Sequence, residues 1–485
     1  MAEATASRSL IDRLFKISER GSTPGREIRG GLVTFFTMAY IIVLNPLIIG
    51  TVPDATGTYL GGGTEPDLAK IAAATALVAG VVTILMGAIA NFPLALATGL
   101  GLNAFVAFGI ATQMTWDDAM GLVVIEGFIM LVLVLTGFRK AVFRAVPREL
   151  KTGISVGIGL FIAFIGLVNG GFISATLLPS PPVELGVGGT LTGWPVLVFC
   201  IGLLTVIVLY ALRVRGAILW AIVGTSVVAV IVEEVGRIGP RDPETNPTGW
   251  TLNAPEIPER VAQLPDLSLL GQFTLLGSWE HVGVVVVVLL VFSLLLTDFF
   301  DTMGTMVAVG SEGGLLDEEG NPLNSQRILV VDSLGTLAGG AGSVSTNTSY
   351  IESAAGVGDG ARTGLASIVT GVCFLLATFL SPLVAMVPNE AAAPALVIVG
   401  FLMMTQIRAI RWDDTELAIP AFLTIALMPF AYSISVGIGA GFVSYVVLKA
   451  VRGKAGEVHP LMWLVAALFA VYFAVEPLQR LLGVS

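Results

Sequence analysis

Two aspartates, Asp298 and Asp301, interrupt a long apolar stretch of the chain. They lie in LLLTDFFDTMGT, and the preceding HVGVVVVVLLVFS carries no charge after its histidine. A carboxylate within hydrocarbon costs about 3 kcal/mol, so such residues usually face a bundle interior and act on ions, protons or polar substrates. With a spacing of three, both side chains would project from one helix face. The alternative, a helix end in cytoplasmic water, suits Asp301 better than Asp298, because the polar stretch GSEGGLLDEEGNP follows.

A third carboxylate, Glu352, ends the polar run STNTSYIE inside an apolar half of the chain. It can accept hydrogen bonds from ring N–H groups, and a half-helix starting here would direct backbone N–H groups toward a ligand. Asn103, in TGLGLNAFVAFG, offers a donor and an acceptor, which suits an amide-like heterocycle. The alternatives are an exposed loop for Glu352 and helix–helix hydrogen bonding for Asn103. The residues predicted to bind substrate are Glu352, Asp298, Asn103, Ile351 and Phe105. Those predicted to couple protons or tune recognition are Asp298 and Asp301.

The elements that position these residues are membrane helices. The 485-residue chain is 55% hydrophobic and only 12% charged, with a mean hydropathy of +0.89. Soluble proteins are about 25% charged. Apolar windows near 20 residues recur, which is the length that crosses roughly 30 Å of hydrocarbon. The apolar runs are continuous rather than alternating, so the sequence predicts a helical bundle and not a barrel.

Composition also excludes several classes of function. The net charge is −10 and no basic patch supports nucleic-acid binding. Cys200 and Cys373 lie in apolar runs and are interpreted as small hydrophobic residues. His281 and His459 are too few for a histidine-rich metal site. The polar N-terminus has no apolar core of a cleaved signal.

The charge distribution tests the topology. The apolar segments are 31–50, 69–90, 94–112, 118–138, 153–175, 194–212, 216–235, 281–309, 327–341, 343–357, 363–387, 391–407, 416–432, 434–451 and 461–482. If the N-terminus is cytoplasmic and the first fourteen segments cross, 20 lysines and arginines lie inside and 4 outside, with Arg480 uncounted. This distribution follows the positive-inside rule. A missed crossing would invert every later loop, so the agreement supports the segment count.

The polar stretch 236–280 is then an extracytoplasmic loop between two halves of seven crossings. Seven is odd, so the second half enters the membrane inverted, as in many secondary transporters. The third segments of the halves, 94–112 and 343–357, are both glycine-broken and polar, which indicates a midplane binding site. Close helix packing explains most of the 57 glycines, but it does not explain the polar residues beside these.

Three other polar features have simpler interpretations. GVGD at Gly356–Asp359 matches a motif of intramembrane aspartyl proteases, but no tyrosine in the chain is followed by the aspartate that such enzymes need. We interpret the match as chance. Glu126 and Asp332 are interpreted as structural hydrogen-bond partners, and Asn45-Pro46 predicts a kink in the first segment.

The chain resembles the adenine/guanine/hypoxanthine permeases, the AzgA-like branch of the nucleobase–cation symporter-2 (nucleobase–ascorbate transporter) superfamily. Four motifs carry the resemblance: GGLVTFFTMAYIIVLNPLI, LATGLGLNAFVAF, TDFFDTMGT and SVSTNTSYIESAAGVGDGARTGLASIVTG. The resemblance spans about residues 26–451 and includes relatives such as the uracil and xanthine permeases.

The resemblance implies an all-α polytopic fold, the uracil-permease fold. It would have about fourteen transmembrane segments in two inverted seven-helix repeats, with a short strand and a half-helix in segments three and ten. The implied parts are a cytoplasmic N-terminus (1–29), a core domain (30–138 and 281–387), a gate domain (139–235 and 388–451), the extracytoplasmic loop (236–280) and a tail (452–485). The apolar stretch at 461–482 exceeds this plan, and it either crosses the membrane or lies along it.

The same resemblance implies the roles of individual residues. Glu352 would bind the purine edge, and Asp298 would bind substrate or couple protons. Asp301 matches a second acidic position that modulates recognition, and Asn103 matches the polar position of segment three. The substrate would lie between segments three, ten and eight, and gate domains would form the interface of a homodimer.

We therefore expect a proton-coupled importer of purine nucleobases, guanine and hypoxanthine or also adenine, that moves its core against its gate. The alternative on the same fold is an anion exchanger or sulfate-type carrier, which the acidic residues at the centre disfavour. We expect no enzymatic activity, cofactor or metal. The expected location is the plasma (inner) membrane, with the N-terminus in the cytoplasm.

Overall fold

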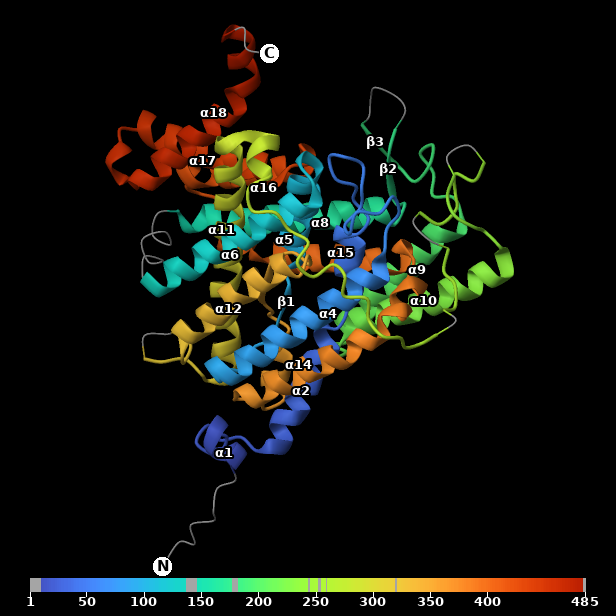
Figure 1. Ribbon diagram of the computed structural model, residues 1–485. Helices are drawn as coiled ribbons and strands as arrows, with labels where there is room; N and C mark the ends of the chain where they lie inside the picture. The colour runs from blue at the N-terminus through green and yellow to red at the C-terminus, as the bar shows by residue number, and fades with distance from the viewer. Residues whose placement is uncertain are drawn as a thin grey trace, which may run out of the picture.

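A computed structural model describes residues 10–136, 146–176, 182–242, 245–251, 254–258, 260–318 and 321–482. Arg8, Arg139, Lys140 and Arg144, which entered the count of cytoplasmic charges, lie outside these residues. The described chain is mainly helical, and Figure 1 shows the very short strand β1 (Leu96–Thr98) near the middle of the molecule, among the helices.

The first half contains the following elements: α1 (Leu10–Phe15), α2 (Pro24–Met38), α3 (Ile41–Ile49), α4 (Leu68–Leu85), η1 (Met86–Ala90), β1 (Leu96–Thr98), α5 (Leu100–Ala104), η2 (Phe105–Ile110), η3 (Ala111–Gln113), α6 (Trp116–Thr136), α8 (Arg148–Asn169), β2 (Ile173–Ala175), β3 (Val183–Leu185), α9 (Trp194–Ala211) and α10 (Ala217–Gly236). Thr23 caps α2, and Pro24 occupies its first turn, where a missing N–H is harmless. Pro46 lies inside α3, and the helical break precedes it at Ala39–Tyr40. The predicted kink therefore lies one to two turns earlier than the proline.

The second half contains α11 (Ser278–Gly313), α12 (Ser325–Ala341), β4 (Asn347–Ser349), α13 (Ser353–Gly358), α14 (Gly364–Ala377), η4 (Thr378–Met386), α15 (Asn389–Met404), η5 (Thr405–Ala409), α16 (Thr415–Phe430), α17 (Ile434–Val451), η6 (Ala455–Glu457) and α18 (Pro460–Leu482). Gly283, with φ of 77°, kinks α11 near its start. This backbone conformation favours glycine because it has no Cβ.

The fourteen predicted segments all have counterparts. Ten described helical stretches are long and apolar enough to cross a membrane. The other four segments are α12 with 17 residues, α16 with 16 residues, and the two broken segments β1–α5 and β4–α13. Segments three and ten thus contain the strand followed by a short helix that the resemblance implied.

Helix packing repeats between the halves in the way that an inverted repeat requires. The first-half helix α6 packs on α11 and α12 of the second half, and its counterpart α14 packs in the same way on α2 and α4 of the first half. Likewise, α8 packs on α16 as α15 packs on α9, and α9 packs on α10 as α16 packs on α17. The helices form two packing groups: α2 to α6 with α11 to α14, and α8 to α10 with α15 to α17.

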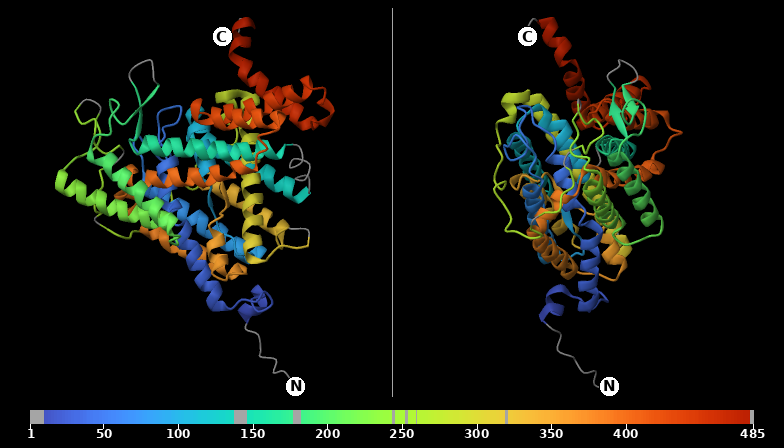
Figure 2. Two further views of the ribbon diagram at one scale, coloured as in Figure 1. Left: turned by 180° about the vertical axis from the view of Figure 1, so that it is seen from behind. Right: turned by 90° about the vertical axis from the view of Figure 1, so that its right-hand side faces the viewer.

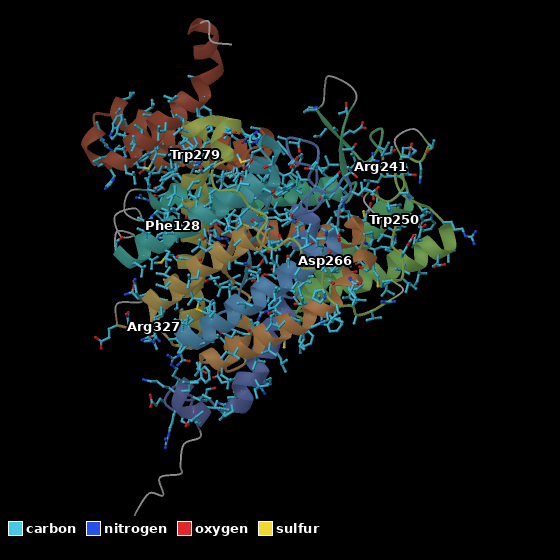
Figure 3. All side chains as sticks on the ribbon, in the orientation of Figure 1. Phe128, Arg241, Trp250, Asp266, Trp279 and Arg327 are labelled. Atoms are coloured by element: carbon cyan, nitrogen blue, oxygen red, sulfur yellow. The ribbon has the colours of Figure 1, made fainter. Side chains whose placement is uncertain are left out.

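The ends of the segments sort onto two faces. On the predicted cytoplasmic face, Arg411 pairs with Glu149 at 2.7 Å and Lys449 with Glu416 at 2.8 Å. On the other face, the 236–280 connection bonds to the ends of α6, α12, η4 and α15. Figure 3 shows Arg327 and Arg241, assigned to opposite faces, at opposite sides of the molecule. A missed crossing would have broken this sorting.

The last helix, α18, lies outside the fourteen-segment plan. It packs on α17, where the ring centroids of Phe442 and Phe469 are 6.2 Å apart. Figure 2 shows its C-terminal end projecting away from the other helices.

Candidate functional site

The two broken segments meet through their strands. β1 and β4 pair antiparallel, with Leu96 opposite Ser349 and Thr98 opposite Asn347. All six strand residues are buried. The hydroxyl of Tyr350 adds a bond of 2.6 Å to the carbonyl of Thr98. Because each strand runs into a short helix, this pairing fixes both half-helices relative to each other.

Glu352 lies just after β4, at the start of α13, and is half-buried. The hydroxyl of Tyr40, at the break between α2 and α3, donates a hydrogen bond to its carboxyl group. Sequence reasoning missed Tyr40, which is only 1% exposed. The sequence feature that could have identified Tyr40 is a polar aromatic residue a few positions before the proline of an apolar segment.

Two predicted residues beside Glu352 are accessible. Ile351 is 48% exposed and the Asp301 side chain is exposed as well. Asp301 lies close enough to Glu352 for their carboxyl groups to interact electrostatically. The structure therefore brings segments eight and ten together, with Asp301 exposed and Glu352 partly exposed where they meet.

Asp298 differs from this expectation. It has no exposed surface, and its Oδ2 accepts a hydrogen bond of 2.9 Å from Thr336 on α12. Three residues advance a helix by about 300°, so the directions of Asp298 and Asp301 differ by about 60°. That angle turns Asp298 toward α12 and leaves Asp301 toward Glu352.

Asn103 and Phe105 are also fully buried. Neither the nitrogen nor the oxygen of the Asn103 amide has a hydrogen-bond partner in the described structure. A buried polar group without a partner costs roughly 1–3 kcal/mol. An amide in this position is therefore suited to a ligand or water that supplies both a donor and an acceptor.

Glu126 and Asp332 lie behind the strands and brace them. Asp332 on α12 accepts hydrogen bonds of 2.8 Å from both Thr302 and Ser349. Glu126 on α6 accepts one of 2.9 Å from Thr346, the residue before β4. These contacts agree with the interpretation of both acids as structural hydrogen-bond partners.

Asp359, the acid of the GVGD match, lies at the C-terminal end of α13 and forms ion pairs. Arg215, between α9 and α10, donates to it at 2.6 Å, and Arg29 on α2 donates to its other oxygen. Burial raises the pKa of this carboxyl group, but the hydrogen bonds from Arg215 and Arg29 outweigh it and hold the pKa below the ordinary aspartate value. A paired carboxylate at a helix end has no resemblance to a protease dyad.

Two other features lie away from this site. A cavity of about 830 Å³ opens at the N-terminal end of α6, lined by Asp54, Asp117 and Asp118 among others. Within the described residues, no group of three or more His, Cys, Asp and Glu residues is placed to hold a metal ion.

Comparison with known proteins identifies relatives along the whole chain. The model of a family described as "Permease family" (Xan_ur_permease) matches residues 25–440. The guanine/hypoxanthine permease PbuG of Bacillus subtilis is 39% identical over 467 residues, covering 95% of this chain and 98% of that protein. The adenine permease AdeP of Escherichia coli is 35% identical, covering 96% of each chain. The guanine/hypoxanthine permease PbuO of Bacillus subtilis is 37% identical, covering 94% of this chain and 99% of that protein.

Solved structures share the fold at low sequence identity. The transmembrane domain of the cyanobacterial bicarbonate transporter BicA aligns with a TM-score of 0.56 and 14% identity, covering 86% of this chain and 96% of that one. The murine anion transporter Slc26a9 in its inward-facing state aligns with a TM-score of 0.59 and 12% identity, covering 93% of this chain and 74% of that one. At these identities the likeness concerns the fold alone.

Proposed function

The chain belongs to the Permease family, and from this premise we propose that it imports purine bases (guanine, hypoxanthine or adenine) by secondary active transport with a proton. The observation that carries the proposal is the position of Glu352 at the junction of the two broken segments, beside accessible Asp301 and Ile351. The named relatives that are guanine/hypoxanthine and adenine permeases support the substrate class.

The chemistry of the site fits a purine edge. The Glu352 carboxylate accepts N–H groups of the ring system, and the hydroxyl of Tyr40 orients that carboxyl group. The free amide of Asn103 supplies a donor and an acceptor for a 6-oxo or 6-amino group. Reaching Asn103 requires a shift of the side chains that now cover it. Ile351 contributes apolar contact with the ring, and Phe105 supports the half-helix from behind.

Alternating access would follow from the two packing groups. We assign the core to 30–138 and 281–387 and the gate to 139–235 and 388–451, with the site on the core. The helices α8, α15 and α16 form the centre of the gate group. Movement of the core against this group would expose Glu352 to one side of the membrane and then to the other.

The remaining parts of the proposal concern placement. We place the protein in the plasma membrane with its N-terminus in the cytoplasm, since the positive charges concentrate on that face. A homodimer through the gate groups is the proposed assembly. Exposed apolar side chains on α9 and α10, such as Leu204, Trp220 and Val227, agree with contact to lipid or to a second copy.

Uptake of radiolabelled guanine, hypoxanthine and adenine into cells tests the function. Glu352→Gln should abolish uptake at wild-type protein levels in the membrane, because an amide cannot replace an anionic acceptor. Glu280→Gln, at an exposed position on the outer end of α11, is the matched control. Uptake by Glu352→Gln at the control rate would remove Glu352 from the site.

Two further measurements separate the parts of the proposal. A protonophore should abolish accumulation, and accumulation that persists would remove proton coupling but keep the purine carrier. A thermal-shift panel of purines, pyrimidines, sulfate and bicarbonate tests the anion-carrier alternative. Stabilisation by an anion and by no purine would overturn the substrate class.

A further inference from the structure

We propose that Glu126 on α6 carries the coupling proton, at a distance from the purine and behind the paired strands. The inference rests on the proposed proton symport and adds the place where the proton binds. Glu126 has no exposed surface. One carboxyl oxygen accepts the Thr346 hydroxyl at 2.9 Å, and the other has no hydrogen-bond partner within the described structure.

Among the residues that the structure describes, the charged groups that act on Glu126 are acids, with no compensating cation. The charged groups that act on it are Asp298, from α11, and Asp332, from α12. Both are buried, and their described hydrogen-bond donors are uncharged hydroxyl groups. The element η3, which also packs on α6, carries no titratable side chain. Three neighbouring carboxylates that are buried repel one another and lose contact with bulk solvent, so they cannot all be ionised.

The hydrogen bonds indicate which acids hold protons. Both oxygens of Asp332 accept a hydroxyl group, which stabilises the charged form. Glu126 and Asp298 each keep one oxygen without a partner, which leaves room for a proton. Of these two, Asp298 shares its Thr336 donor with the carbonyl of Asn347, whereas Glu126 bonds directly to the residue before β4.

This contact gives a route from the proton to the substrate. The backbone carbonyl of Thr346 accepts a hydrogen bond of 3.0 Å from Gly99, at the end of β1. Thr346 therefore joins Glu126 to both broken segments, and the chain continues through β4 to Glu352. When Glu126 binds a proton it loses its negative charge, so its hydrogen bond from the Thr346 hydroxyl becomes weaker. The position of β4 against β1 is then held less firmly.

A source of protons lies at the outer end of the same helix. The cavity of about 830 Å³ is lined by Asp117 and Asp118 in the first turn of α6. Glu126 lies eight residues farther along than Asp118, or about 12 Å at the helical rise per residue. The proton would enter Glu126 from that side and leave it toward the cytoplasm after the core has moved.

The test uses the full-length protein in proteoliposomes, with Glu126→Gln as the main variant. Wild-type protein with one proton per base reaches up to about tenfold guanine accumulation per pH unit of gradient. Glu126→Gln should retain guanine binding and exchange counterflow, yet lose accumulation and pH dependence. Glu390→Gln is the matched control, because Glu390 is also buried, at 2% exposed, and bonded to a threonine, but lies at the outer end of α15. Accumulation by Glu126→Gln with the pH profile of the control would overturn the inference.

A second variant and a substrate-free measurement keep the test decisive. If Glu126→Gln fails to fold, Thr346→Val removes only the hydroxyl contact and should shift the pH midpoint of uptake; an unchanged midpoint would overturn the inference. Infrared spectroscopy at neutral pH should show absorption by protonated carboxylic acids, and the component that belongs to Glu126 should be lost in Glu126→Gln and kept in Glu390→Gln. An intact band in Glu126→Gln would refute the proton site even without transport. Absence of purine binding by the wild-type protein would instead refute the proposed function.

Discussion

The ion pairs of Asp359 provide a direct test of movement between the two packing groups. Asp359 ends the half-helix that begins at Glu352, and it binds Arg29 from its own group and Arg215 from the other. The two arginines are similarly exposed, at 63% and 62%, while the aspartate side chain is 8% exposed. Arg215→Gln removes the bond between groups, and Arg29→Gln removes a comparable bond within one group.

The expected magnitude follows from exposure. Exposed ion pairs contribute about 0–1 kcal/mol and hydrogen bonds to charged groups about 1.5–3 kcal/mol. A buried carboxylate with an exposed guanidinium at 2.6 Å lies between these, at about 1 kcal/mol. That energy changes the equilibrium between two arrangements of the groups, one with Arg215 bound to Asp359 and one with the two residues apart. It favours the bound arrangement by a factor of roughly 5.

A reporter cysteine at the accessible position Ile351 measures this equilibrium, in protein whose Cys200 and Cys373 are replaced. When the two arrangements are similarly populated in the parent protein, a fivefold change in their ratio lowers the fraction in the present arrangement from about one half to about one sixth. Arg215→Gln should therefore lower the rate of labelling by a polar maleimide about threefold. It should remain unchanged with Arg29→Gln, and high salt should reduce the difference between the variants. Equal effects of both variants on labelling, or no effect of Arg215→Gln, would refute the movement of one group against the other.

Three further outcomes are expected. Gly30→Ala should lower the free energy of unfolding by about 1–3 kcal/mol, because a Cβ there would lie 2.6 Å from a side-chain carbon of Ala361. Gly304→Ala should be tolerated, because a Cβ at that position meets nothing within 4 Å. Thermal melting of the two purified variants tests this difference. Thr251→Val should cost about 1–3 kcal/mol, since it removes a hydroxyl donor from buried Glu390, and an unchanged melting temperature would contradict it. The pKa of Asp359 is lower in the folded protein than its unfolded value of about 3.9. The stability that its ion pairs contribute is therefore complete above the unfolded pKa and is lost as the pH falls through the folded pKa. The ratio of labelling rates between Arg215→Gln and the parent protein should stay constant from about pH 8 to 5 and change only below about pH 4.

The apolar pattern was sufficient to predict the architecture. The thickness of the bilayer sets the length of each apolar segment, and the orientation of the segments sets which loops carry positive charge. Both properties can therefore be recognised in the sequence. The same reasoning located the two broken segments, because glycine and polar residues at matching places of an inverted repeat are visible without knowledge of packing. The structure has both strands and both short helices there.

The details of the site were less accessible to sequence. Asp298 and Asp301 share a motif, yet only Asp301 is exposed, because about 60° of helix rotation turns one toward α12 and the other toward Glu352. Tyr40 bonds to Glu352 although 312 positions separate them. Asp359 matched a protease motif by chance, and its arginine partners lie 330 and 144 positions away.

The sequence by itself therefore determined how many segments cross the membrane, how they divide into two inverted halves, and which segments carry buried polar groups. Only the tertiary structure decided which carboxyl group is accessible, which hydroxyl orients it, and which acids are buried together. The physical reason is that membrane insertion depends on local hydrophobicity summed along the chain. The state of a buried acid depends on neighbours that the fold brings together from distant parts of the chain.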